Sequence, residues 1–442
     1  MKKFLTYMIL ILILMLTNVA LASEANVVSI DLEESIHIAL ENNHSIKQSI
    51  AKQAEAKWSL SEAKRQTGLN LQYEFSGKRV GGNRKHKDYQ DDDYDRDYSH
   101  SATISIPIYS GGRLESEQKA AQFALNSADI ELEKTRQEVK FQTTKAYYNI
   151  LLCREMIIIN KEAVTILEEY LKKANAQFEL GRSARSDILA STVQLANAKK
   201  NLRTAQSNYD KSMAELNNIM GLPVQTQLAI HDQLYYSKYD LNIDDCIAYA
   251  LENRPDYAAA NYGVKQAKAE VGIAKSDFLP QISAEANRTN AGDSMFKTDH
   301  ERSWSAGIMA KWNIFDNGIT NARVREMLAE LHKAEDIANE ISDKIKLEVH
   351  SVYIDLIAEE DNIKIISTAV SQAEEECTLA QVRYVEGIGT NLSVMDAQEK
   401  LTESRTSYYT SLFKYITAKA ALDKAMGVPV ELNIPRYSSS PN

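Results

Sequence analysis

The chain uses one unit of about 200 residues twice. Three short segments recur in the same order along its 442 residues: IALENN (38–43) returns as YALENR (249–254), PIYSGG (107–112) as NIFDNG (313–318), and IMGLPV (219–224) as AMGVPV (425–430). The members of the first pair are 211 residues apart, and those of the other two pairs are 206 residues apart. A tandem repeat with so constant a spacing predicts the same succession of helices and strands in both copies.

A fourth match lies inside otherwise helical sequence. FELGRSARSDILAS (178–191) returns 206 residues later as YVEGIGTNLSVMDA (384–397), and each begins with an aromatic residue three positions before a glycine. Glycine within a helix costs about 1 kcal/mol relative to alanine, so each segment is predicted to be a turn between two helices. Gly181 and Gly387 are expected to adopt the left-handed conformation that ends a helix. The candidate caps of the returning helices are Ser183 or Ser186 in the first copy and Thr390 or Ser393 in the second.

Long helices account for the composition. Only 7 Pro and 16 Gly occur among the 442 residues, which is typical of long helices rather than of loops. The two longest helices are predicted at about 113–180 and 319–386, where roughly 68 residues at about 1.5 Å each give about 100 Å. Shorter helices are predicted at about 32–66, 187–220, 242–277 and 393–426.

A segment of strand-like sequence precedes each long helix. Leu69, Leu71, Tyr73 and Phe75 alternate with polar residues, and the second copy repeats this alternation around Trp304. A period of two predicts strands with one apolar and one polar face. The predicted strand pairs lie at about 69–110 and about 280–315. At about 9–11 residues, each strand has the length that a tilted transmembrane β-strand requires.

The N-terminus reads as an export signal. Lys2 and Lys3 precede an apolar run at 4–16, and Ala20 and Ala22 form a cleavage site, so cleavage is expected after Ala22. The apolar run is too short to span a membrane. The predicted organisation is a signal peptide (1–22), a first structural repeat (23–240), a second structural repeat (241–432) and a short C-terminal tail (433–442).

The sequence contains no pattern that predicts catalysis. We find no H-E-x-x-H, no G-x-S-x-G and no phosphate-binding loop, and the eight histidines are scattered. We therefore expect no enzyme activity, no cofactor and no metal site. The net charge of −10 argues against nucleic acid as a partner. Cys153, Cys246 and Cys377 are expected to be buried core residues, and the acidic segment 88–97 a solvated loop, because it lacks the glycine and terminal glutamate of a calcium loop.

Two classes of protein fit these features. A periplasmic coiled-coil protein, structural or an adaptor, would explain the export signal and the helices. It would not explain four amphipathic strands, which are too few for a stable soluble sandwich. A closed barrel is the one way for strands to cross a membrane, and strands from several copies of the chain could form it.

The ordered set of landmarks (ALEN, the strand ends PIYSGG and NIFDNG, the two glycine turns and the closing MGLPV and MGVPV) resembles the TolC-like outer membrane efflux proteins over about 30–432. The resemblance implies a mainly α fold with a small β part. Long antiparallel helices from tandem repeats would form a periplasmic α-barrel, and four strands per chain would contribute to a trimeric 12-stranded transmembrane β-barrel. It implies an outer-membrane exit channel of a tripartite efflux or type I secretion system. The implied partners are a homotrimer, a periplasmic adaptor, an inner-membrane transporter and outer-membrane lipid.

The resemblance also implies a gate at the glycine turns. The family has a Tyr three residues before the second glycine and an Asp six residues after the first, linked in the closed state, and Tyr384 and Asp187 match them. The alternative is that Tyr384 packs in the coiled coil and that Asp187 is a charge at a helix N-terminus. In the family these turns also dock the adaptor, and the matching residues are Phe178, Gly181, Gly387 and Gly389.

The remaining gate positions match only in part. The family often has Asp six and nine residues after the second glycine, where this chain has Ser393 and Asp396, so one acidic ring is expected. An Arg that some members have two residues after that glycine is Gly389 here. The closed-state contact must therefore differ, and Arg182 or Arg185 of the first turn could supply it.

Overall fold

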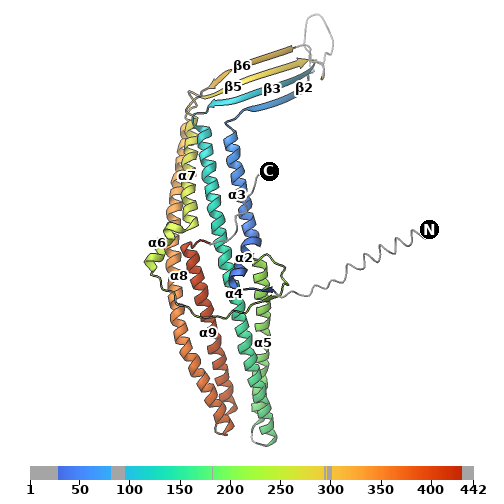
Figure 1. Ribbon diagram of the computed structural model, residues 1–442, viewed down its shortest axis with the longest axis vertical. Coiled ribbons are helices and arrows are strands. Elements are labelled where there is room, and N and C mark those ends of the chain that lie inside the picture. The colour runs from blue at the N-terminus through green and yellow to red at the C-terminus, as the bar shows by residue number, and fades with distance from the viewer. Residues whose placement is uncertain (1–27, 81–94, 182, 293–294, 296–300, 431–442) are drawn as a thin grey trace, which may run out of the picture. The chain divides into compact units, whose positions relative to one another are not determined.

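The computed structural model describes residues 28–80, 95–181, 183–292, 295 and 301–430. The predicted signal peptide (1–22), the predicted tail (433–442) and most of the acidic segment 88–97 lie outside these residues. The elements run, in chain order, β1 (Val28–Ser29), α2 (Leu32–Asn42), α3 (His44–Arg65), β2 (Asn70–Val80), β3 (Asp95–Tyr109), α4 (Arg113–Glu179), α5 (Arg185–Ile219), β4 (Leu228–Ala229), α6 (Ile243–Asn253), α7 (Pro255–Ser276), β5 (Gln281–Gly292), β6 (Glu301–Lys311), α8 (Ile319–Val385) and α9 (Asn391–Met426) (Figure 1).

The same order of elements occurs twice. Two helices, two strands, a 67-residue helix and a return helix make up each run, and α4 and α8 begin and end 206 residues apart. Ile345, Val349 and Leu356 of α8 are buried. Among the helices in the described part of the chain, none has the length and apolar character needed to cross a membrane.

The four long strands form one antiparallel sheet in the order β2-β3-β5-β6. Residues paired across antiparallel strands lie on the same face. Leu71 pairs with Ile104, which pairs with Ala286, which pairs with Ala306, so the apolar residues of all four strands share one face. This face is uncovered in the chain, where Leu71 is 66% exposed and Ile308 is 73% exposed. The predicted two-faced strands are confirmed.

The chain divides into two compact units, and each unit takes segments from both sequence copies. Among the described residues, one unit comprises 28–46, 136–181, 183–242 and 350–424, and the other comprises 47–80, 95–135, 243–292, 295, 301–349 and 425–430. The first unit contains both glycine turns, and its core includes Tyr147, Leu216 and Tyr415. The second contains the sheet. Cys153, Cys246 and Cys377 are buried thiols, as predicted.

Candidate functional site

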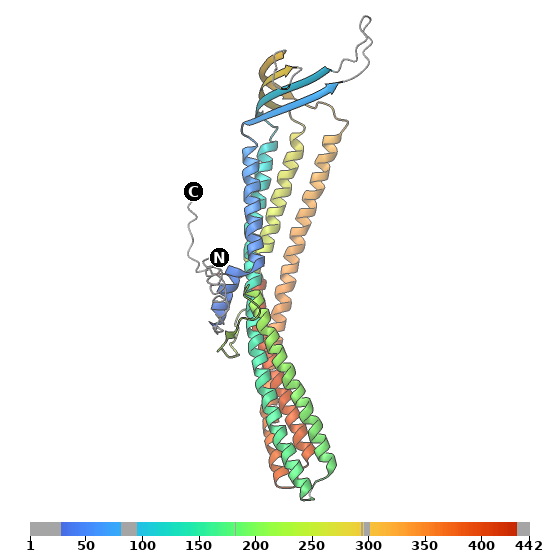
Figure 2. The same cartoon turned by 90° about the vertical axis from the view of Figure 1, so that its right-hand side faces the viewer.

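The two glycine turns and the helices that they join are the candidate site. We call the C-terminal end of α4, the turn at Gly181 and α5 the first tip hairpin, and the corresponding parts of α8 and α9 with Gly387 the second tip hairpin. In both views α5 returns beside α4, and α9 returns beside α8 (Figures 1 and 2). Val164 and Leu167 of α4 pack on Leu195 of α5.

Both glycines have the predicted left-handed backbone. φ is +71° at Gly181 and +76° at Gly387, and a Cβ at either position would have no atom within 4 Å. The glycines are therefore required by the backbone conformation and not by packing. In the first turn the Gly181 amide donates to the Phe178 carbonyl at 2.8 Å, and in the second the Ile388 amide donates to the Arg383 carbonyl at 3.0 Å.

Gly389 is required by a close approach. Its amide donates to the Arg383 carbonyl at 2.9 Å. A Cβ at this position would lie 3.0 Å from the carbonyl carbon of Arg383 and 3.0 Å from the amide nitrogen of Tyr384. Because these are backbone atoms of the preceding helix, a side chain such as arginine does not fit this turn without a shift of the chain.

The caps of the two return helices differ. Thr390 is confirmed as a cap, because its hydroxyl accepts a hydrogen bond from the Ser393 amide at 3.2 Å. The prediction of Ser183 or Ser186 was wrong. The N-cap is Ala184, whose backbone amide donates a hydrogen bond to the Asp187 carboxylate, with 3.3 Å between nitrogen and oxygen. The extended residue that starts α5 falls between the two serines, so an acidic side chain three positions on satisfies the helix end instead.

Tyr384 lies at the contact between the two hairpins. Its side chain is 6% exposed and packs with Tyr170 and Val394, with 5.8 Å between the two ring centroids. Its hydroxyl donates to the Gln177 side chain at 3.2 Å, so the direct bond to Asp187 implied by the resemblance is replaced here. Asp187 is still close enough to act electrostatically: burial first, and then this carboxylate, raise the pKa of the Tyr384 phenol.

Asn391 makes a second contact between the hairpins, and the sequence alone did not indicate this residue. It is 5% exposed, and its amide group donates to the Ser191 hydroxyl at 2.7 Å and to the Asp187 carbonyl at 3.4 Å. Its Oδ1 is buried and has no partner among the described residues. The sequence could have indicated that Asn391 is buried. It lies three and four residues before Val394 and Met395, which are buried, and residues at this spacing share one face of a helix.

The other predicted residues lie on exposed surface or outside the described chain. Asp396 and Arg185 are exposed. The hydroxyl of Ser393, also exposed, lies 2.7 Å from that of Thr390. Arg182 lies outside the described residues. The structure thus brings Tyr384 and Asp187 together at one contact and leaves Ser393, Asp396 and Arg185 apart from it.

A family model described as "Outer membrane efflux protein" matches residues 35–222 and 246–428. The chain belongs to the outer membrane efflux protein family. The two matches coincide with the two runs of elements. The channel is an outer-membrane protein for efflux or secretion, its helical part lies in the periplasm, and the soluble coiled-coil alternative is not favoured.

Relatives agree with this assignment. The alkaline protease secretion protein AprF of Pseudomonas aeruginosa is 24% identical, over 77% of this chain and 72% of its own length. The outer membrane efflux protein BepC of Brucella suis is 20% identical, over 75% of this chain and 73% of its own length. The solved structure of the Campylobacter jejuni CmeC outer membrane channel has a TM-score of 0.79 at 16% identity and covers 90% of this chain and 85% of that one. This likeness confirms the predicted fold class.

Proposed function

We propose that three copies of the chain form one channel, whose twelve strands close into a barrel in the outer membrane. Residues 1–22 are removed on export, and the two repeats (23–240 and 241–432) form the mature channel. The observation that carries the proposal is the exposed apolar face shared by all four strands. An open four-stranded sheet with such a face is prone to aggregation in water. Closure with the sheets of other copies removes its edges and turns its apolar face to lipid.

The opposite face of the sheet supports a water-filled interior. Gln72 pairs with Thr103, Thr103 with Asn287 and Asn287 with Ser305, so one row of polar side chains crosses all four strands. A barrel with lipid outside places these residues toward its lumen. A polar lumen lets hydrated cargo pass without binding it tightly.

The tip hairpins form the periplasmic gate of this channel. Tyr384 and Asn391 hold the second hairpin on the first in the closed state, and Asp187 acts through its carbonyl and its charge. Opening separates the hairpins and breaks these hydrogen bonds while each hairpin keeps its own packing. Asp396 and Ser393 face the closing pore, where Asp396 attracts cations.

The partners are a periplasmic adaptor and an inner-membrane transporter. Members of the family are trimers within tripartite efflux and secretion systems, and Phe178, Gly181, Gly387 and Gly389 belong to the turns that meet the adaptor. The channel itself carries out no reaction. Because one relative is named for protease secretion and another for efflux, the cargo is either a polypeptide or a small molecule.

Membrane fractionation combined with an unboiled gel tests the proposal. We expect the expressed protein in the outer membrane, migrating as a trimer that boiling converts to monomer. A monomer released by osmotic shock would contradict the proposal and favour a soluble periplasmic protein.

A further inference from the structure

The arginines of the four-stranded sheet are separated from its acidic residues. The strands β2, β3, β5 and β6 contain four arginines and five acidic residues. By register, all four arginine positions share the apolar face: Arg79, Arg96, Arg288 and Arg302. All five acidic positions share the opposite face: Glu74, Asp95, Asp97, Glu285 and Glu301. Among the described strand residues, the apolar face thus carries no carboxylate.

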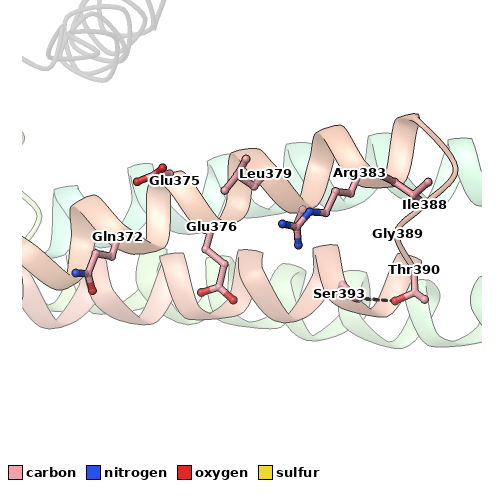
Figure 3. Close-up of a pocket in the computed structure, with 10 residues that line it drawn as sticks. Gln372, Glu375, Glu376, Leu379, Arg383, Ile388, Gly389, Thr390 and Ser393 are labelled. Carbon is pink, nitrogen blue, oxygen red and sulfur yellow. Dashed lines mark hydrogen bonds between the residues drawn. The ribbon is translucent and has the colours of Figure 1, made fainter.

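At the second glycine turn, by contrast, charges of both signs lie together. Glu375, Glu376 and Arg383 line one groove between α8 and α9 (Figure 3). The strands keep the two signs on separate faces instead. Closure of the proposed barrel does not change this, because identical copies bring the same positions to the same face. The pattern therefore indicates a negatively charged partner that does not belong to the strands.

The arginines lie at the end of the sheet that is farthest from the helices. Strand β6 precedes α8 and reaches its helix-side end at Lys311 (Figure 1). Arg302 is nine residues from Lys311, or about 30 Å along the strand at about 3.4 Å per residue. With a strand tilt of about 40°, this is a height of about 23 Å in an apolar band about 25 Å tall. Arg288, which pairs with Trp304, lies two residues deeper.

The helix-side half of the same face is uncharged. Its paired residues are Leu71, Ile104, Ala286 and Ala306 in one row and Ile106, Ala284 and Ile308 in the next. A charge on the lipid face is most costly at the membrane midplane and least costly near the interface. Because the helical part lies in the periplasm, the arginine end of the face meets the outer leaflet.

Aromatic rings mark the same level of the sheet. Phe75 and His100 pair in the row that contains Arg302, and their ring centroids are 4.9 Å apart. The Tyr73 hydroxyl lies 2.7 Å from Nδ1 of His100, and Tyr98 stacks on Phe75 with 6.3 Å between centroids. Aromatic side chains concentrate where acyl chains meet headgroups, so these rings place the arginines at the level of the headgroups.

We propose that this end of the apolar face binds the phosphate groups of the phosphorylated glycolipid in the outer leaflet. Arg288 and Arg302, both exposed, are the main ligands. A guanidinium binds a phosphate through two parallel hydrogen bonds, and the long arginine side chain lets the charge of Arg288 reach outward from its deeper position. Arg79 and Arg302 also have interactions within the chain, and the five N–H donors of a guanidinium allow a second partner. The inference rests on the proposed barrel.

Lipid binding to the purified full-length trimer in detergent tests this site. The probe is diphosphoryl lipid A, and native mass spectrometry measures the bound lipid over a range of lipid concentrations. We expect the wild type to bind this probe at least about tenfold more tightly than lipid A without phosphates or phosphatidylglycerol. Arg288→Gln with Arg302→Gln should weaken binding of the probe by about tenfold or more. Lys78→Gln with Lys311→Gln, the matched control, removes the same charge from the opposite face and should bind like the wild type.

Arg288→Lys guards against a folding defect in the double arginine variant. It keeps the charge and loses the paired hydrogen bonds, so binding should fall by less than in the double variant. The unboiled gel shows which variants remain trimers, and if the double variant does not assemble, unchanged binding in Arg288→Lys contradicts the site.

Three further results would overturn the site. The first is a wild-type trimer that binds lipid A without phosphates, or phosphatidylglycerol, as tightly as the probe. The second is displacement of the probe by inorganic phosphate alone, which would indicate a site for the free ion. The third is an equal loss of binding in the arginine and lysine double variants. In each case the proposed function stands, whereas a wild type that is a monomer on the unboiled gel would contradict both.

Discussion

The first and second tip hairpins follow the same backbone course and differ in the side chains at equivalent positions. Where the second hairpin has the buried Tyr384 and Asn391, the first has the exposed Phe178 and Arg185. The two hairpins stand at equivalent positions of the repeat but differ in what covers these positions. The second hairpin places buried, neutral hydrogen-bonding groups there, and the first places an exposed cation and an exposed ring.

The residues that directly precede α3 and α7 show a related difference. The Asn43 amide group donates to the Ile219 carbonyl at 2.8 Å, and the equivalent Arg254 donates to the Ala425 carbonyl at 3.1 Å. Arg254 also pairs with Asp256 and Glu348. The second copy therefore adds an ion network to a contact that both copies share.

Arg254→Ala should have the largest effect and would remove this difference between the copies. It leaves the half-buried Asp256 and Glu348 without their cation, and we expect a loss of about 2–4 kcal/mol in the free energy of unfolding. Asn43→Ala, the matched change, removes two neutral hydrogen bonds, one to the Ile219 carbonyl and one from the Ser45 amide, and should cost about 1–2 kcal/mol. Thermal unfolding of the detergent-solubilised protein measures both. Equal losses would show that the ion network adds nothing.

Asn391→Ala should weaken the contact between the hairpins of one chain by about 2 kcal/mol, since it leaves the Ser191 hydroxyl without its partner. In the proposed gate the closed state contains this contact, so the variant should open more often. Planar-bilayer recordings should show a higher mean conductance than the wild type. Thr402→Ala, a polar change elsewhere on α9, is the control and should leave conductance unchanged.

Low pH should weaken the ion pairs of Arg254. The resulting loss of stability should be smaller than the loss caused by Arg254→Ala. Burial opposes ionisation of Asp256, but its hydrogen bonds and the charge of Arg254 outweigh burial and lower its pKa. A lowered pKa in the folded state stabilises the protein above the unfolded value of about 3.9. That stabilisation is lost as the pH falls through the folded value. Unfolding temperatures measured between pH 7 and pH 3 should therefore fall below about pH 4, and Asp256→Asn should flatten this part of the curve.

Tyr384→Phe should have the smallest effect. It removes one hydroxyl hydrogen bond to Gln177, worth about 0.5–1.5 kcal/mol, and keeps the ring packing against Tyr170. Conductance should rise slightly, by less than in Asn391→Ala. If conductance rises more in Tyr384→Phe than in Asn391→Ala, then the Tyr384 hydrogen bond, and not that of Asn391, contributes more to holding the hairpins together.

Local patterns predicted the elements well because helices and turns depend on nearby residues. The helix predicted at about 113–180 is Arg113–Glu179, and both glycines have positive φ. Strand β3 begins at Asp95, before the apolar alternation starts, because backbone pairing with β2 continues where the side chains are polar. Non-local features were missed. The burial of Asn391 depends on a helix about 200 residues away in the chain, and the partner of Arg254 at Glu348 is 94 residues away.

The most direct test of the channel is whether the two faces of one strand meet lipid and water. Ile308 lies on the apolar face of β6 and Ser305 on the polar face, and both are exposed in the chain. We expect a membrane-impermeant maleimide to label Ser305→Cys in outer membranes and to leave Ile308→Cys unlabelled until the protein is denatured. Equal labelling of the two cysteines in intact membranes would contradict the account.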